Sequence, residues 1–180
     1  MDLREFVRAS LERTRQRTLQ ALQGLTPEQW HWRPYPGANS IAFLVFHIFR
    51  VEDRYFHRWL SAEGEVWTKE GWERHILLPP HPPGVDPVWT TGNSWTAADV
   101  EAWVPPPMET LLRYGERVRQ SAITVLKGLD FSRLDYAPRA DRPQFTLAYY
   151  LYQASHHEAE HQGQIDYLKG LFPQRRISHG

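Results

Sequence analysis

The segment HHEAEHQGQIDY, from His156 to Tyr167, places three histidines within six positions. On a helix, His157 and His161 lie about 40° apart around the axis and about 6 Å apart along it. Both imidazoles can then reach one ion at the usual Zn–N distance of about 2.0–2.1 Å. His156 points roughly 100° away from His157 and cannot join them. The spacing therefore predicts that His157 and His161 hold a divalent metal ion.

Two ligands hold an ion poorly, and the third predicted ligand is His47. It lies in FLVFHIFRVE, a segment apolar enough to be a buried helix, while His157 and His161 fall on the apolar stripe of their own helix. Buried imidazoles need partners, and for each histidine taken singly a hydrogen bond to a neighbouring helix is the alternative explanation. Three neutral imidazoles with an open position are instead typical of a catalytic metal site.

The same segment also fits the zinc-protease motif H-E-x-x-H, in which Glu158 would be the general base. Only 19 residues follow His161, and they contain neither a glutamate nor the histidine extension of that motif. The third ligand that such a protease needs is therefore missing. A zinc protease is kept as the remote alternative.

The chain contains no cysteine, so a tight transition-metal site has to use histidine and carboxylate. Basic and acidic residues balance at 21 each, which argues against nucleic acid as the main partner. The N-terminal segment is too charged for a signal peptide, and the most apolar run, SIAFLVFHIF, is too short to span a bilayer. We therefore expect a cytoplasmic protein that acts on a small molecule and binds neither nucleic acid nor a membrane.

The elements that must position these histidines are helices, because apolar residues recur at three- and four-residue steps in four long segments. The predicted helices cover residues 3–24, 41–62, 108–128 and 146–171. Thr26 begins a capping box, and Ser40 and Thr96 are predicted helix caps. Leu3 and Phe6 are placed on the buried face of the first helix.

The connection between the second and third long helices, residues 65–106, has a composition of its own. All eight tryptophans and eight of the fourteen prolines lie in the middle of the chain, mostly within this stretch. So much proline predicts a long crossover with one short helix. The pattern predicts one all-α domain over residues 1–180, an up-down-down-up four-helix bundle. We expect the crossover tryptophans to cover the bundle; the wall of a pocket is the alternative.

Two segments carry a resemblance to a known family. LTPEQWHWRPYPGANSIAFLVFHIFRVEDRYF resembles the first loop and second helix of the DinB-like superfamily of bacterial proteins, which includes YfiT-like and mycothiol-dependent branches. HHEAEHQGQIDYLKG is similar to its closing H-x-x-x-H-x-G-Q-I signature. The resemblance covers nearly the whole chain and implies the same bundle and a three-histidine metal site, with His47, His157 and His161 at the matching positions. Gln162 stands where a basic residue is usual, and we expect it to face solvent.

The resemblance also implies a divalent ion, commonly zinc or nickel, and relatives that are transferases or isomerases dependent on mycothiol or bacillithiol. We therefore expect a metal-dependent, transferase-like or hydrolase-like enzyme, with a low-molecular-weight thiol as a further cofactor. A non-catalytic protein that binds the metal or a small ligand is the alternative, and a fourth protein ligand would favour it. No catalytic residue beyond the ligands is assigned. Bundles often pair, so a homodimer is expected without a named interface.

Residues near the histidines have supporting roles to test. Glu158 and Glu160 either orient imidazole N–H groups or face solvent, and solvent is the expectation for Glu160. Gln164, one turn beyond His161, is expected to support the site. Gly163 predicts the close approach of another helix, because glycine is costly in a helix interior. The charged residues within 50–53 are expected to pair with a neighbouring helix.

Overall fold

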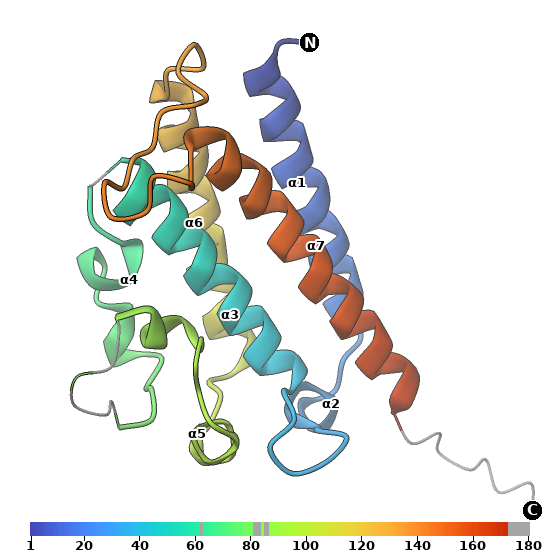
Figure 1. The fold of residues 1–180 in the computed structure, drawn as a ribbon. Coiled ribbons are helices and arrows are strands. Elements are labelled where there is room, and N and C mark those ends of the chain that lie inside the picture. The colour runs from blue at the N-terminus through green and yellow to red at the C-terminus, as the bar shows by residue number, and fades with distance from the viewer. Residues whose placement is uncertain (62, 81–83, 85–86, 173–180) are drawn as a thin grey trace, which may run out of the picture.

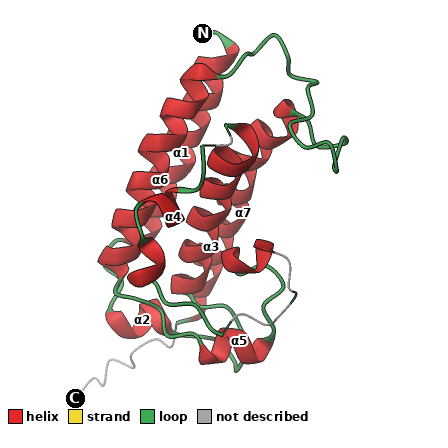
Figure 2. Cartoon of the chain, turned by 90° about the vertical axis from the view of Figure 1, so that its left-hand side faces the viewer, coloured by secondary structure: helices red, strands yellow, loops and turns green. Residues whose placement is uncertain are grey.

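The computed structural model describes residues 1–61, 63–80, 84 and 87–172. These residues form helices and loops and contain no strand, as the sequence predicts (Figure 2). The four long helices are α1 (Leu3–Leu22), α3 (Ile41–Asp53), α6 (Met108–Gly128) and α7 (Leu147–Leu171). Helix α7 packs against α1 and α3, and α3 also packs against α6 (Figure 1). None of the described helices is both long and apolar enough to cross a membrane.

The second predicted long helix changes character part of the way along. It is α-helical as α3 and continues as a π-helix over Arg54–Leu60. The prediction of one helix over residues 41–62 is therefore right as far as Leu60 but misses the widened part, and residue 62 lies outside the described residues. Such π-helical turns are uncommon in proteins, and those that occur often lie at functional sites.

Shorter elements fill the connections. They are α2 (Pro27–His31), α4 (Val66–Lys69), α5 (Ala97–Ala102) and 3₁₀ turns at Trp72–Arg74 and Pro87–Thr91. The predicted caps are confirmed: Thr26 and Thr96 each form a capping box, and the Ser40 hydroxyl accepts a hydrogen bond from the Phe43 amide. These caps satisfy amide groups that a helix start leaves unpaired.

The core surrounds α3, in which every residue from Ile41 to Asp53 is buried. Trp67, Trp89 and Trp103 are buried as well, and the rings of Phe46 and Trp103 lie 5.0 Å apart. The crossover tryptophans thus cover α3, as expected. Large aromatic surfaces buried in this way stabilise the position of α3, the helix that carries His47.

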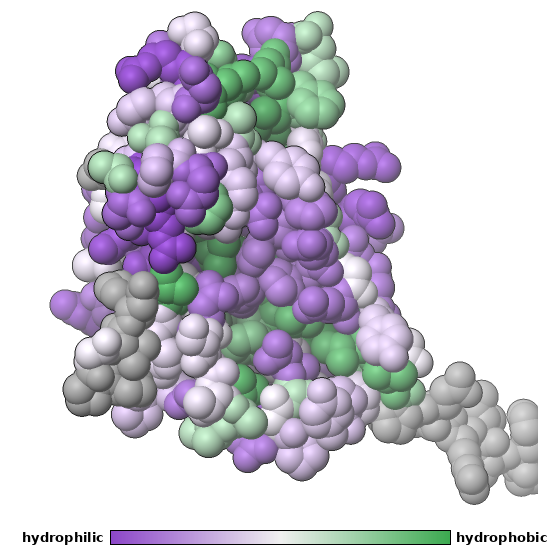
Figure 3. Space-filling view, in the orientation of Figure 1, coloured by the Kyte–Doolittle hydropathy of each residue, from purple (hydrophilic) through white to green (hydrophobic). Residues whose placement is uncertain are grey.

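The start of α1 differs from the prediction. Leu3 and Phe6 are 45% and 60% exposed, whereas Arg15, which is charged, is only 6% exposed. Figure 3 shows apolar residues at the surface at the upper end of the molecule, beside the start of α1. Helical periodicity alone does not reveal where a helix extends past its neighbours. It also does not reveal that buried glutamates of other helices pair with Arg15.

Candidate metal centre

The structure brings the three predicted histidines together. His47 extends from α3, and His157 and His161 extend from α7. The Nε2 atom of His157 lies 3.0 Å from that of His47 and 3.1 Å from that of His161. One nitrogen from each of the three lies within 4.8 Å of the others, a grouping able to hold a metal ion. Their assignment as metal ligands stays a prediction.

The outer nitrogens of two of these rings have fixed partners. His47 Nδ1 lies 2.7 Å from the carbonyl oxygen of Thr91, and His161 Nδ1 lies 2.9 Å from the side-chain oxygen of Gln164. Both oxygens can only accept, so each Nδ1 carries the proton and donates it. The Nε2 lone pairs of His47 and His161 are then free to bind a cation, in the arrangement usual around metal sites. The supporting role expected of Gln164 agrees with this contact.

Burial keeps two of these imidazoles, those of His47 and His157, neutral. It lowers the pKa of His47 to about 4. Burial, together with the neighbouring His47 and His161 rings, lowers the pKa of His157 to about 2. Metal ions bind the neutral form of histidine, so neither ring has to lose a proton to bind an ion near neutral pH.

The donor set fits a divalent cation. Two Nε2 lone pairs about 3 Å apart repel each other unless a proton or a cation lies between them. In a tetrahedral zinc site with Zn–N bonds of about 2.0–2.1 Å, ligand nitrogens are about 3.3 Å apart. The distances from His157 Nε2 to the Nε2 atoms of His47 and His161, 3.0 and 3.1 Å, are close to this value. Among the described residues, no further histidine or carboxylate belongs to the group. Three protein ligands leave a position for a substrate, as catalytic sites do.

Glu158 faces away from the histidines. Its carboxylate accepts from Arg15 Nε at 2.8 Å and from Arg119 Nη2 at 2.7 Å, and it is 1% exposed. Glu52 on α3 binds the same two arginines. We call Arg15, Glu52, Arg119 and Glu158 the arginine–glutamate cluster. A carboxylate held there can neither orient an imidazole nor act as the general base of a zinc protease, so that hypothesis is wrong for this residue.

Three neighbours of the pair can also be compared with the sequence predictions. His156 binds Glu160 at 3.1 Å on the outside of α7, so it does not join the site, and Glu160 is exposed as expected. Gln162 was expected to face solvent but is 6% exposed and donates to the Asp166 carboxylate. Gly163 has open space where a side chain would begin, so close packing of another helix does not explain it.

A second set of buried polar contacts explains how the crossover reaches His47. Arg50 pairs with Asp53 and Glu65 and donates to the carbonyl oxygen of Thr90 at 3.2 Å. This contact holds the chain where the next residue, Thr91, presents its carbonyl to His47. Among the charged residues within 50–53, the expected ion pairs with neighbouring helices are formed by Glu52, which binds arginines of α1 and α6. Arg50 instead pairs within its own helix and with Glu65, just before α4. The role of Thr91 had no signal in the sequence, because it acts through its backbone.

Comparisons with known proteins agree with the fold and show the family. A crystal structure of a conserved protein from Enterococcus faecalis superposes with a TM-score of 0.78, at 19% identity, over 94% of this chain and 96% of that one. At this identity the likeness concerns the fold. None of the curated proteins matches. The family model of the DinB superfamily matches residues 10–165, a span that includes all three histidines. The chain therefore belongs to the DinB superfamily.

Proposed function

We propose that this protein is a metal-dependent enzyme that holds one divalent ion, zinc or nickel, with His47, His157 and His161. It would transfer or rearrange a group through the sulfur of a low-molecular-weight thiol. The observation that carries the proposal is the convergence of three imidazole nitrogens without a fourth described ligand. That arrangement favours catalysis over a purely structural metal site.

A divalent ion at this position would lower the pKa of a thiol or water that joins it, and so supply a nucleophile near neutral pH. The chain has no cysteine, so the thiol has to come from a small molecule. The contribution of the protein is positioning: Thr91 and Gln164 orient His47 and His161. Hydrolysis, with water in place of the thiol, is the second reaction that this donor set supports.

The finer architecture is inferred as well. In Figure 1, α1 and α7 run toward the lower end of the picture, whereas α3 and α6 run toward the upper end. These directions support an up-down-down-up bundle, in which a short connection precedes α3 and the long crossover leads to α6. The bundle places His47 opposite two successive turns of α7. A homodimer remains an expectation from the sequence.

Elemental analysis of the purified protein tests the metal site. We expect about one zinc or nickel ion per native chain and none in the variant that combines His47→Ala, His157→Ala and His161→Ala. The matched control is His156→Ala on the same helix, which should keep its ion because His156 lies outside the site. A triple variant with the full complement of ion would overturn the proposal.

A thiol-consumption assay then separates an enzyme from a non-catalytic binder. The metal-loaded protein is mixed with a panel of low-molecular-weight thiols and an electrophilic aryl halide, and the loss of free thiol is followed. We expect consumption that stops on chelation and returns when zinc or nickel is restored. A fully loaded protein that consumes none of the thiols and hydrolyses no ester would instead favour the non-catalytic alternative.

A further inference from the structure

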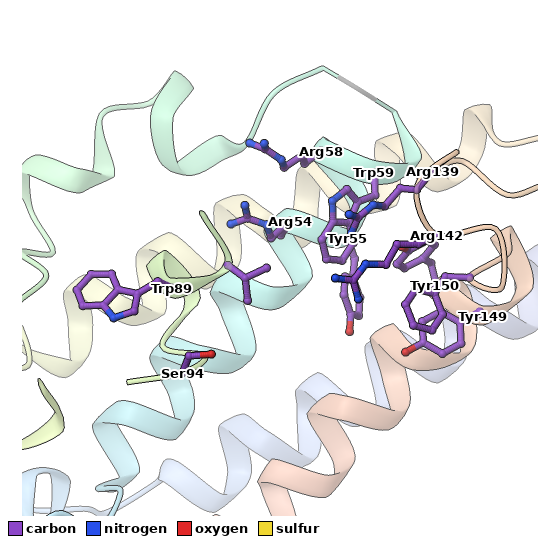
Figure 4. Close-up of a pocket in the computed structure, with 12 residues that line it drawn as sticks. Arg54, Tyr55, Arg58, Trp59, Trp89, Ser94, Arg139, Arg142, Tyr149 and Tyr150 are labelled. Carbon is purple, nitrogen blue, oxygen red and sulfur yellow. The ribbon is translucent and has the colours of Figure 1, made fainter. Parts of the chain in front are cut away.

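A pocket of about 550 Å³ lies between the π-helical segment, the crossover near Trp89 and the loop that precedes α7 (Figure 4). Four of its lining residues are arginines, six are aromatic, and none is a carboxylate. A volume of this size is typical of sites for small molecules. The pocket therefore combines a concentrated positive charge with flat apolar surfaces.

The arginines face the pocket from two sides. Arg54 and Arg58 come from the π-helical segment, and Arg139 and Arg142 come from the loop opposite (Figure 4). In the described part of the chain, two carboxylates lie within 4.0 Å of these arginines. Glu65 lies 3.7 Å from Arg54 and 4.0 Å from Arg58, and Asp141 lies 2.6 Å from Arg139.

Arg142 has no described carboxylate within 4.0 Å, so its guanidinium can still take an anionic partner. Among the residues that the structure describes, the two loop arginines Arg139 and Arg142 have one paired carboxylate between them, that of Asp141, so this side of the pocket carries an excess of positive charge. Guanidinium groups bind carboxylates through two parallel hydrogen bonds, which makes arginine the usual residue for recognition of such anions.

Three of the six aromatic residues pack together into one wall of the pocket. The Tyr55 ring lies 5.2 Å from Trp59 and 5.5 Å from Tyr150, and Trp59 lies 5.2 Å from Tyr150. The Arg139 guanidinium lies over Trp59, 4.9 Å from the ring centre. Such a wall favours a flat ligand that can stack on it, with its charge directed toward the arginines.

The pocket adjoins the histidines. Tyr55 lines the pocket, and its ring centre lies 6.5 Å from that of His157. Trp89 also lines it, and two residues later Thr91 binds His47. A molecule in the pocket would therefore sit beside the proposed metal position.

We infer that this pocket binds a planar organic anion, an aromatic or conjugated carboxylate, with Arg139 and Arg142 recognising its charge. As the substrate class of the reaction, this inference rests on the proposed function. The binding itself depends on the pocket residues and can be measured with no metal present.

Calorimetry with 1-naphthoate, and with neutral 1-naphthamide as the matched ligand, tests the inference on metal-free protein. We expect naphthoate to bind at least about tenfold more tightly than naphthamide, and to weaken as sodium chloride is added. The double variant Arg139→Gln/Arg142→Gln should lose at least about tenfold in naphthoate affinity and less than about twofold in naphthamide affinity. The exposed pair Arg13→Gln/Arg17→Gln on α1 is the control and should bind both ligands as the native protein does.

The outcomes distinguish this inference from the proposed function. Equal affinity for the two ligands, or full naphthoate affinity in the double variant, overturns the anion pocket. Naphthoate binding that needs zinc and ignores the arginines overturns it as well. Binding that survives in the triple histidine variant supports the pocket whatever the metal analysis shows. Arg142→Gln alone, at an exposed loop position, replaces the double variant if the latter does not fold.

Discussion

Two polar clusters lie on different sides of α7, and they include two α7 residues, His157 and Glu158, that are neighbours in the chain. His157 faces His47 on α3, whereas Glu158 faces Arg15 on α1 and Arg119 on α6. The arginine–glutamate cluster joins all four long helices, and each of its charges meets two opposite charges. In the histidine cluster, three imidazoles direct their nitrogens at one another, and no carboxylate of the described residues belongs to the group.

Burial has different consequences in the two clusters. Burial raises the pKa of Glu52, but Arg119 and Arg15 outweigh that effect and hold the pKa below its usual value. Burial of His47 is not compensated in this way, so its pKa falls. The opposite charges of the first cluster satisfy each other within the protein. The neighbouring imidazole lone pairs of the second cluster instead need a proton or a cation between them. The first cluster thus stabilises the fold, and the second is suited to bind a metal ion.

The largest expected effect breaks the arginine–glutamate cluster. Glu158→Ala leaves two buried guanidiniums short of acceptors and should lower the free energy of unfolding by about 3–5 kcal/mol. Urea denaturation monitored by circular dichroism measures the change. Glu160→Ala, two positions away and exposed, should cost no more than about 0.5 kcal/mol. If the two variants were equally stable, the cluster would not have the role assigned to it.

An intermediate effect is expected from acid, because the clusters lose stability over different pH ranges. For metal-free protein, the folded-state pKa of His47 is about 4, below its ordinary value near 6.5. The unfolded chain therefore binds the proton first, and stability falls as the pH drops from about 6.5 to 4. Glu52 has a lowered pKa too, so its contribution is present above about 4.3 and is lost only below that pH.

Unfolding measured at a series of pH values separates the two contributions. His47→Gln should reduce the slope between about pH 6.5 and 4, to which His157 with its lowered pKa also contributes, and leave the loss at lower pH intact. A native metal-free protein whose stability stays constant from pH 7 to 5 would contradict the assignment of neutral buried histidines.

The smallest expected effect concerns the support of His161. Gln164→Ala removes the acceptor for the Nδ1–H group of His161 and should weaken zinc affinity by about tenfold. We expect the lower end of the range for partners of metal ligands because this contact lies near the surface. Competition with a chromogenic chelator measures the affinity. Gln16→Ala, exposed on α1, is the control. Equal affinities for the two variants would show that Gln164 does not support the site.

Many features of the fold and of the histidine cluster could be predicted from local patterns in the sequence. The four long helices, the caps of α3 at Ser40 and of the short α5 at Thr96, and the pairing of His157 with His161 follow from periodicity and from the geometry of one helix. The meeting of His47 with that pair was predicted from its apolar setting and the family resemblance. These features depend on neighbours in the sequence, or on a motif that reports a shared fold.

Other features could not be predicted because they depend on contacts between distant segments. Glu158 was expected either to orient an imidazole or to face solvent. It instead binds arginines that α1 and α6 supply. Gln162 turned out to be buried, although the pattern suggested an exposed position. The arginines of the pocket are separated by about 80 positions, between Arg58 and Arg139, and nothing in either segment indicates that they share a cavity.

The sequence by itself determined the kinds of elements, where they begin and end, and which side chains were able to bind a metal, because these depend on spacing along a single helix. Only the tertiary structure decided that His157 faces His47 while Glu158 faces two arginines. Adjacent residues on a helix point about 100° apart, so their chemistry depends on which neighbouring helix lies in each direction.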